Sequence, residues 1–364
     1  MEIIVFCPTG NQALVDVGLL MRHLPIRVGW AKIGPMSSIQ TTPSHAAGAN
    51  GIPDALVVAI DLGGTNIRTA LCDTHGQILK RLKQPTRPEE GRDRVIQRMI
   101  DSVREVVPTE SQIRAVAVAS PGPLNPRTGI VMVAPNLFWH NVPLQQIMQD
   151  ALNIPVRLGN DANLAALGEQ RYGAGKGYAD MAYVTVSTGI GCGVILNNQL
   201  VVGARGLATE LGHHCINFTG APIASGVPGG FEGYCAGPGI AKRAQARLAE
   251  GGPSILSEMV GGAISKVGAK EVGQAAKLGD PLALALVQET GYILGMGFVN
   301  LLHLFDVEAI VVGGSVSLMG NVLFDPVRET IQKFAMPPYR DRQLLMVALG
   351  DDGGLLGAAA LASE

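Results

Sequence analysis

The chain has 364 residues, a formal net charge of −2 at pH 7, 47% hydrophobic residues and 16% charged residues. This length allows two packed domains, and the composition excludes a disordered chain. The near-neutral charge and the lack of a basic run argue against nucleic acid or an anionic membrane as a partner. The five cysteines contain no Cys-x-x-Cys pair and predict a reduced, cytoplasmic protein.

Residues 1–55 differ from the rest of the chain. No clear periodicity precedes residue 35, and Ser37–Asp54 is rich in Ser, Thr, Pro, Gly and Ala, which is typical of a flexible linker. We therefore expect a poorly ordered N-terminal extension and linker, either an accessory segment or the product of an over-called start site. No secretory signal is recognisable. The apolar stretch Tyr292–Phe305 is too short and too polar to span a bilayer, and it predicts a buried helix.

From residue 56 onward, short β-branched runs alternate with helical patterns, which predicts an α/β fold. The first unit is a hairpin of two strands, Val57–Asp61 and Arg68–Cys72, joined by the turn Gly63–Asn66. The further predicted elements are the helix Arg92–Val107, the strand Ile113–Ala119, the helix Pro143–Leu152, the strand Val156–Leu158, the helix Asp161–Tyr172, the strands Ala182–Ser187 and Cys192–Leu196, a helix starting at Asp280-Pro281, the strand Ala309–Val312 and a C-terminal helix of small residues.

The tip of the first hairpin is nearly bare backbone. Its main-chain N–H groups lie beside an acid at the end of the first strand and a base at the start of the second, and amides with one carboxylate suit polyphosphate and Mg²⁺. An ordinary glycine hairpin is the alternative. The predicted nucleotide-site residues of this unit are Asp61, Gly63, Gly64, Thr65, Asn66 and Arg68, with Asp61 holding Mg²⁺ through water and ATP.

Two further glycine turns follow later strands. Thr188 and Gly189 belong to a second strand–turn–strand unit that is similar to the first, and Gly313 and Gly314 follow a late strand. Two similar hairpins predict two lobes built on one plan. Three glycine turns together can hold both ends of a nucleotide between such lobes.

Asn160 and Asp161 stand between a short strand and a helix, where both residue types favour the N-cap position. Capping alone explains them. A kinase that acts on a hydroxyl, however, needs one positioned carboxylate to accept the proton as the phosphoryl group transfers. Asp161 is therefore the predicted general base.

Glu210, His213 and Glu232 occur within glycine-rich loops. Each carboxylate can accept hydrogen bonds from adjacent hydroxyls, so two carboxylates and an imidazole suit a polyol. A structural histidine is the alternative for His213.

These residues together resemble the ROK family of sugar kinases, its bacterial glucokinases above all, over about residues 56–361. The motifs that carry the resemblance are "DLGGTNIR", "SPGP", "APNLFW", "GNDANLAALGE", "ELGH", "STGIGCG" and "VVGGSVS". The resemblance implies a two-lobed, actin-like and hexokinase-type (ribonuclease H-like) ATPase fold. The small lobe covers 56–157 with the C-terminal helix near 353–364, and the large lobe covers 158–352. It also implies ATP, Mg²⁺ and a homodimer or larger assembly, and sugar contacts from Asn136, Asn160, Glu210, His213 and Glu232.

One departure concerns the zinc site that the resemblance implies, which uses a histidine and three cysteines. The aligned cysteine positions hold Ile223, Ser225 and Gly230, so we expect no structural zinc. Packing must then order the loop, with Pro222 and Pro228 limiting its freedom. A replacement site from His214, Cys215 and Cys235 has the wrong spacing.

The expected activity is ATP-dependent phosphorylation of a hexose, with glucose converted to glucose 6-phosphate. Other acceptors stay open, namely N-acetylmannosamine, fructose, mannose and allose, and so does polyphosphate as the donor. The rival functions are a sugar-responsive ROK-type regulator, another actin-like ATPase and a sugar-sensing pseudokinase. Residues 1–55 offer no pair of short helices and no basic recognition face for DNA.

Overall fold

The computed structural model describes residues 2–6, 12–16, 55–108 and 112–364. By their contacts the residues form two units, Met1–Asn50 and Gly51–Glu364. In the first unit, β1 (Glu2–Phe6) pairs antiparallel with β2 (Gln12–Asp16), a pair that the sequence analysis did not predict. The predicted linker Ser37–Asp54 lies outside the described residues.

The second unit begins with a five-stranded sheet. Its strands, in spatial order, are β10 (Val156–Asn160), β6 (Ile113–Ser120), β3 (Leu56–Leu62), β4 (Asn66–Cys72) and β5 (Ile78–Pro85). β3 is antiparallel to β4 and parallel to β6, so the predicted hairpin is confirmed. The turn is one residue shorter than expected, because Asn66 already pairs with Pro85 of β5.

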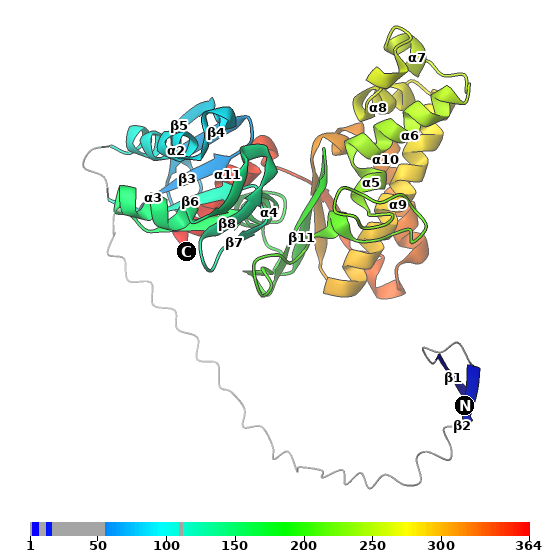
Figure 1. The fold of residues 1–364 in the computed structure, drawn as a ribbon, viewed down its shortest axis with the longest axis horizontal. Coiled ribbons are helices and arrows are strands. Elements are labelled where there is room, and N and C mark those ends of the chain that lie inside the picture. The colour runs from blue at the N-terminus through cyan, green and yellow to red at the C-terminus, as the bar shows by residue number, and fades with distance from the viewer. Residues whose placement is uncertain (1, 7–11, 17–54, 109–111) are drawn as a thin grey trace. The chain divides into compact units, whose positions relative to one another are not determined.

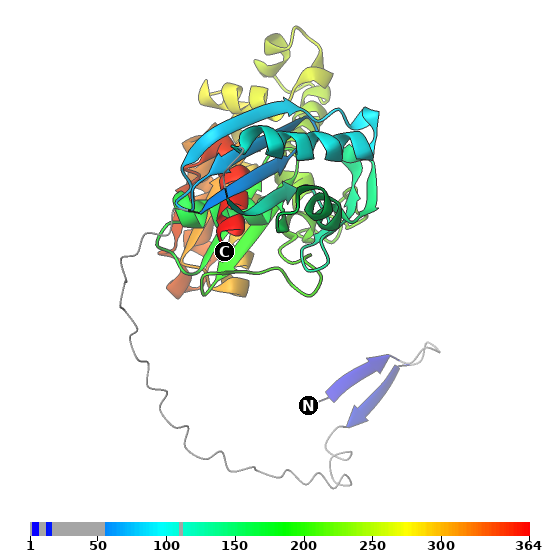
Figure 2. The ribbon, with the colours of Figure 1, turned by 90° about the vertical axis from the view of Figure 1, so that its left-hand side faces the viewer.

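Alternation along β3 divides its side chains between two layers. Val58, Ile60 and Leu62 pack in the cluster that contains the apolar stripe of α2 (Arg92–Val106), and Figure 2 shows α2 lying across the strands. Val57 and Ala59 pack instead in the cluster of α11 (Gly353–Ser363). Asp61 follows the second set in register, so its side chain faces the layer of α11.

The second five-stranded sheet repeats the plan of the first. Its strands, in spatial order, are β13 (Gln199–Leu200), β12 (Ile190–Leu196), β11 (Met181–Val186), β14 (Ala309–Gly313) and β15 (Gln343–Met346). As in the first sheet, the first strand in sequence is antiparallel to the second and parallel to the fourth. The predicted similarity of the two hairpin units therefore extends to whole sheets.

Helices cover one face of the second sheet (Figure 1). They are α6 (Gly237–Ala249), α8 (Ala269–Lys277), α9 (Pro281–Phe305) and α10 (Asn321–Phe334). By length and composition alone α9 passes as a membrane span, with a mean hydropathy of 1.5, but 56% of that window is buried inside the protein. α9 is thus a core helix, as its sequence predicted.

α4 (Asp161–Tyr172) contacts both sheets. It packs with α11 against the first sheet and against β11 and β12 of the second. The helices α4 and α11 approach closely at Gly357, because glycine has no side chain. A Cβ atom at this position would overlap the carbonyl of Leu164. At the other end of α4, the buried Glu169 accepts hydrogen bonds from the N–H groups of Ala174, Ala348 and Leu349.

The remaining strands and α-helices lie between the elements already described along the chain. They are the small antiparallel sheet β7 (Leu124–Asn125), β8 (Ile130–Ala134) and β9 (Trp139–Val142), together with α3 (Leu144–Leu152), α5 (Glu232–Cys235) and α7 (Leu256–Met259).

Candidate active site

The strand pairing places two predicted site residues, Asp61 and Asn160, at one edge of the first sheet. Asn160 pairs with Ser120, and Asp61 pairs with Ala119, at the carboxyl ends of three parallel strands. In open α/β sheets, ligands bind outside these carboxyl ends. The first sheet therefore places Asp61 and Asn160 at the same edge, which is the edge where open α/β sheets bind their ligands.

Asp61 is held by Arg68 from the opposite strand of the hairpin. The Nε and Nη2 groups of Arg68 both donate to Oδ2 of Asp61, with the Nε–Oδ2 distance at 2.9 Å. Burial raises the pKa of Asp61, the Arg68 guanidinium lowers it, and nearby Asp352 raises it further, with a net rise. The other oxygen, Oδ1, faces Gly354 at the start of α11.

The first glycine turn is closed by its own backbone. The N–H of Gly63 donates to Asn66 O at 2.9 Å, and Thr86 fastens the turn through its hydroxyl, which donates to Gly63 O at 2.6 Å. Asn136 packs directly on this turn, since a Cβ atom on Gly64 would lie 3.1 Å from its Cβ. The structure thus brings Asn136 to the first turn.

The second and third glycine turns are neighbours. Ser187 N donates to Gly189 O at 2.9 Å, and the hydroxyls of Ser187 and Ser315 lie 3.1 Å apart. Gly314 has a φ of 89°, and a Cβ atom there would overlap Val186 O. A residue with a side chain therefore fits neither the dihedral angle nor the space at Gly314.

Asn160 and Asp161 take different positions at the start of α4. Asn160 is the N-cap, and its Oδ1 accepts from the N–H groups of Ala162 and Asn163 at 3.0 and 3.3 Å. The capping interpretation therefore holds for Asn160. Asp161 is the first helical residue, and its side chain is solvent-accessible, with Oδ1 accepting from Ala162 N at 2.8 Å.

Asn160, Asp161 and Glu210 line one small cavity of about 180 Å³. It is smaller than the ~300–1,000 Å³ pockets that take larger ligands. Its other lining residues are Pro121, Gly122, Ala162, Asn163, Gly191, Cys192, Gly206, Ala208 and Thr209. The three predicted polar side chains, from the end of β10, the start of α4 and the segment before His213, therefore share a space suited to a small polar molecule.

The pKa of Asp161 is raised above its ordinary value. The main cause is the surrounding protein, which displaces hydration although the side chain is open to the cavity. The hydrogen bond from Ala162 N opposes this rise, and the negative charges of Asp61 and Glu210 add to it. A raised pKa makes the Asp161 carboxylate a stronger base than that of a free aspartate.

His213 and Glu232 lie next to the cavity residues without lining that cavity. The Nε2 atom of His213 is 3.9 Å from Glu210 Oε2. Oε2 of Glu232 lies 3.0 Å from the Cβ position of Gly189 and 3.3 Å from that of Gly212. Glu232 thus stands between the second glycine turn and the segment that carries His213.

Two further residues line the cavity: Gly122, which belongs to the "SPGP" motif, and Thr209, which was not predicted from the sequence. Thr209 has a φ of 67°, and its hydroxyl donates to Cys192 O at 2.9 Å. A Cβ atom on Gly122 would lie 3.4 Å from Nδ2 of Asn160. The position of Thr209 follows from no local sequence signal, because it depends on a contact with Cys192, seventeen residues earlier in the chain.

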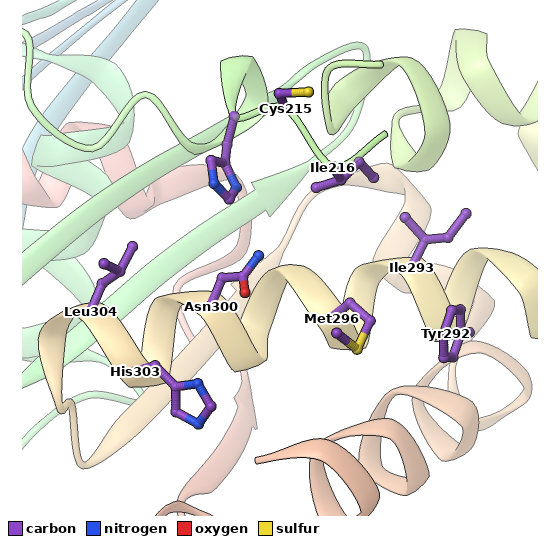
Figure 3. A pocket seen from close by; sticks show the side chains of 9 residues that line it. Cys215, Ile216, Tyr292, Ile293, Met296, Asn300, His303 and Leu304 are labelled. Carbon is purple, nitrogen blue, oxygen red and sulfur yellow. The ribbon is translucent and has the colours of Figure 1, made fainter. Parts of the chain in front are cut away.

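A separate cavity of about 520 Å³ contains none of the predicted site residues (Figure 3). Cys215 lines it together with Met296, Asn300 and His303 of α9. Cys235 is buried elsewhere, with its thiol directed at Thr290 O. Among the residues that the structure describes, no group of three or more His, Cys, Asp or Glu side chains is placed to hold a metal ion.

The duplicated sheets, each with a hairpin that turns through glycine, define a two-lobed α/β fold of the actin-like, hexokinase type. The chain belongs to the ROK family, whose sequence model matches residues 57–364. Glucokinase from Thermotoga maritima is 33% identical over 318 residues, which cover 86% of this chain and 99% of that protein.

Solved structures and regulators are also similar to the chain. A ROK family glucokinase from Streptomyces griseus, in complex with glucose and AMPPNP, aligns with a TM-score of 0.69 and 32% identity over 84% of this chain and 99% of that one. The xylose repressor of Caldicellulosiruptor bescii is 28% identical, and the match covers 84% of this chain and 77% of that protein.

Proposed function

We propose that the chain is an ATP-dependent hexose kinase that phosphorylates the 6-hydroxyl of glucose. The observation that carries this proposal is the shared cavity of Asn160, Asp161 and Glu210, at the end of β10 and the start of α4. The glucokinase relatives, and the glucose and AMPPNP in the complex of the Streptomyces griseus enzyme, support both substrates.

Asp161 accepts the proton of the attacking hydroxyl. Its raised pKa suits this role, because a base works best when its pKa lies near the working pH. Removing a general base of this kind lowers the rate by about 10²–10⁴-fold. Asn160, whose Oδ1 caps α4, keeps its Nδ2 group for a substrate oxygen.

The other polar side chains orient the sugar ring. The carboxylates of Glu210 and Glu232 accept hydrogen bonds from ring hydroxyls, and His213 forms a hydrogen bond with another hydroxyl. Asn136, which packs on the first turn, contacts the sugar from there. Together these groups offer acceptors and donors in fixed directions, which a polyol with several hydroxyls needs for selective binding.

The nucleotide binds along the three glycine turns. Gly63, Gly64, Thr65 and Asn66 in the first turn and Thr188 and Gly189 in the second hold phosphate oxygens, while Gly313 and Gly314 lie beside the nucleoside. A cavity of about 330 Å³ next to the third turn supports this placement of the nucleoside. Ser315 and Val316 line it together with Lys270 and Lys277 of α8.

Mg²⁺ fits beside Asp61, because Arg68 occupies only Oδ2 and leaves Oδ1 without a hydrogen bond in the described structure. The ion, when bound with ATP, neutralises phosphate charge during transfer. Zinc does not fit the loop at 223–230, where the positions of the three thiolates hold Ile223, Ser225 and Gly230.

An ADP-release assay over a panel of hexoses tests the proposal, with Asp161→Asn as the control. We expect the fastest turnover with glucose and ATP, and a loss of about 10²–10⁴-fold in kcat for the variant. The panel includes N-acetylmannosamine, fructose, mannose and allose as acceptors and polyphosphate as a donor. If Asp161→Asn turns over as fast as the parent chain, the assignment of the base is wrong.

A sugar-responsive regulator is the second candidate, because xylose repressors are among the relatives. In such a protein the cavity binds a sugar without transferring phosphate. Binding of labelled duplex DNA, measured with and without glucose, separates the two functions, and sugar-dependent DNA binding without ADP release favours the regulator.

We also propose a cytoplasmic homodimer or larger homo-oligomer. The family resemblance supports the assembly, and the scattered cysteines support a reducing compartment. Light scattering of the purified chain measures its mass in solution, and a monomer at micromolar concentration would contradict the proposed assembly.

A further inference from the structure

The ring of His213 has a partner on each side. Its Nδ1 atom lies 2.9 Å from the hydroxyl oxygen of Ser225, and its Nε2 atom faces Glu210 Oε2 at 3.9 Å. Ser225 is twelve residues further along the chain, so the contact depends on how the intervening loop folds. The sugar-site imidazole is therefore oriented by a residue outside the predicted sugar site.

The segment from Cys215 to Gly230 folds back on itself and brings Ser225 to the ring. Cys215 pairs antiparallel with Gly230, and Pro222 pairs antiparallel with Pro228. At the tip, Ile223 N donates to Val227 O at 3.0 Å. The loop thus forms a narrow hairpin, with Ser225 at its tip and the two prolines paired across it.

Ile223, Ser225 and Gly230 stand where the family resemblance implies cysteines, and each of them contacts another residue. A Cβ atom on Gly230 would lie 2.5 Å from Cδ1 of Ile223, so the two positions complement each other in volume. Ser225 contacts His213 through its hydroxyl. The three positions therefore close the loop with apolar packing, backbone pairing and one hydrogen bond, in place of thiolate ligands.

The Ser225 hydroxyl, which can donate or accept, and the Glu210 carboxylate, which only accepts, together favour one form of the neutral imidazole. A hydroxyl that donates to Nδ1 occupies the lone pair of that nitrogen, and the ring proton then resides on Nε2. Glu210 favours the same form, because its carboxylate attracts an N–H group at Nε2. A metal ion on Nδ1 has the same consequence, since it also occupies that lone pair.

We propose that Ser225 replaces the zinc ion as the group that fixes the ring of His213, so that this chain presents Nε2–H to its sugar from a zinc-free loop. Ser225 is a positioning residue, since it acts through His213. The proposal rests on the proposed function, because His213 contacts the sugar in that function. Its two independent signatures are the tautomer of His213 and the absence of bound zinc.

The experiment compares the full chain with Ser225→Ala and Ser225→Thr, and with Thr219→Ala as a matched control. Thr219 belongs to the same loop, but its hydroxyl contacts Asn217 and not His213. We expect Ser225→Ala to lower kcat/KM for glucose about 3- to 10-fold, mainly through KM, because a single neutral hydrogen bond is lost. Ser225→Thr keeps the hydroxyl and restores at least half of the parent value.

Long-range ¹H–¹⁵N spectra of the histidine rings give a readout that does not depend on activity. The His213 signal, assigned by its loss in His213→Gln, should show the proton on Nε2 in the parent chain and a mixture of both forms in Ser225→Ala. Elemental analysis after growth in zinc-supplemented medium should find far less than one zinc ion per chain.

Three results would overturn the proposal: one zinc ion per chain, an unchanged His213 spectrum in Ser225→Ala, or an equal loss of kcat/KM in Thr219→Ala. The last result would attribute the effect to general loosening of the loop. Absence of kinase activity on every hexose would instead overturn the proposed function, while the spectra and the zinc content would still decide the role of Ser225.

Discussion

Arg68 and Asp61 face each other across the β3–β4 hairpin, and the guanidinium donates two hydrogen bonds to a single carboxylate oxygen. The pair leaves the other oxygen, Oδ1, directed at the start of α11. The register of a hairpin with a short turn thus determines which carboxylate oxygen of the proposed metal-binding acid is left open.

Replacing Arg68 with methionine should raise the KM for MgATP about 10-fold or more, because a charge-assisted hydrogen bond contributes roughly 1.5–3 kcal/mol. Without the guanidinium, the pKa of Asp61 rises further, so the defect should grow as the pH falls. Initial rates between pH 5 and pH 9 measure this. Arg328→Met, which removes an exposed ion pair with Asp325, is the control and should leave KM unchanged.

Asp161→Asn should stabilise the fold at neutral pH while it removes activity. The folded-state pKa of Asp161 is raised above 3.8, so the native state binds more protons than the unfolded state. Its contribution to stability is therefore lost as the pH rises from about 3.8 through the folded pKa. Urea unfolding of both chains from pH 4 to pH 8 should show a difference that grows with pH, and a constant difference would contradict the assigned shift.

Gly314→Ala should be more destabilising than Gly320→Ala, although both residues have positive φ values, 89° and 73°. Both substitutions carry a backbone strain of about 1–3 kcal/mol. Only Gly314 also meets a backbone carbonyl, that of Val186, whereas Gly320 faces open space. Denaturant midpoints and nucleotide affinity, measured on both variants, isolate the contribution of the clash. Equal losses in both would argue against close packing of the third turn.

Gly230→Ala should destabilise the loop by about 1–3 kcal/mol, because its new methyl group overlaps Ile223. Ile223→Ala in the same chain should recover part of this loss, since it removes the overlapping atoms. A double-mutant cycle on unfolding free energies should give a coupling of about 0.5–3 kcal/mol. Additive losses would mean that the two positions do not pack together.

Much of the fold follows from local sequence signals. The glycine turns between β-branched runs predict both hairpins, and the spacing of Val95, Met99, Val103 and Val106 predicts α2. β5 was missed because most of its side chains are exposed, so its sequence lacks an apolar pattern. The shared strand order of the two sheets could not be predicted in this way, because it depends on the pairing of β11 with β14, which are far apart in sequence.

The candidate site divides in the same way. Asn160, Asp161 and Glu210 were predicted from motifs and line one cavity, while the roles of Asp161 as the base and of the other two as sugar contacts stay predictions. The contact between His213 and Ser225 was not predictable, because it depends on the turn that closes at Ile223 and Val227. Likewise, no motif marks Thr209 as a cavity residue.

The repeated sheet plan gives two hairpins of unequal chemistry. Asp61 and Arg68 are paired in the first sheet, and the corresponding pair in the second sheet is Thr185 and Gly191. At this position one hairpin thus carries two formal charges, and the other carries a hydroxyl and a glycine. A ligand with chemically distinct ends therefore has one favourable orientation between the two sheets. Two sheets with the same strand order can in this way determine which end of a ligand lies on which side.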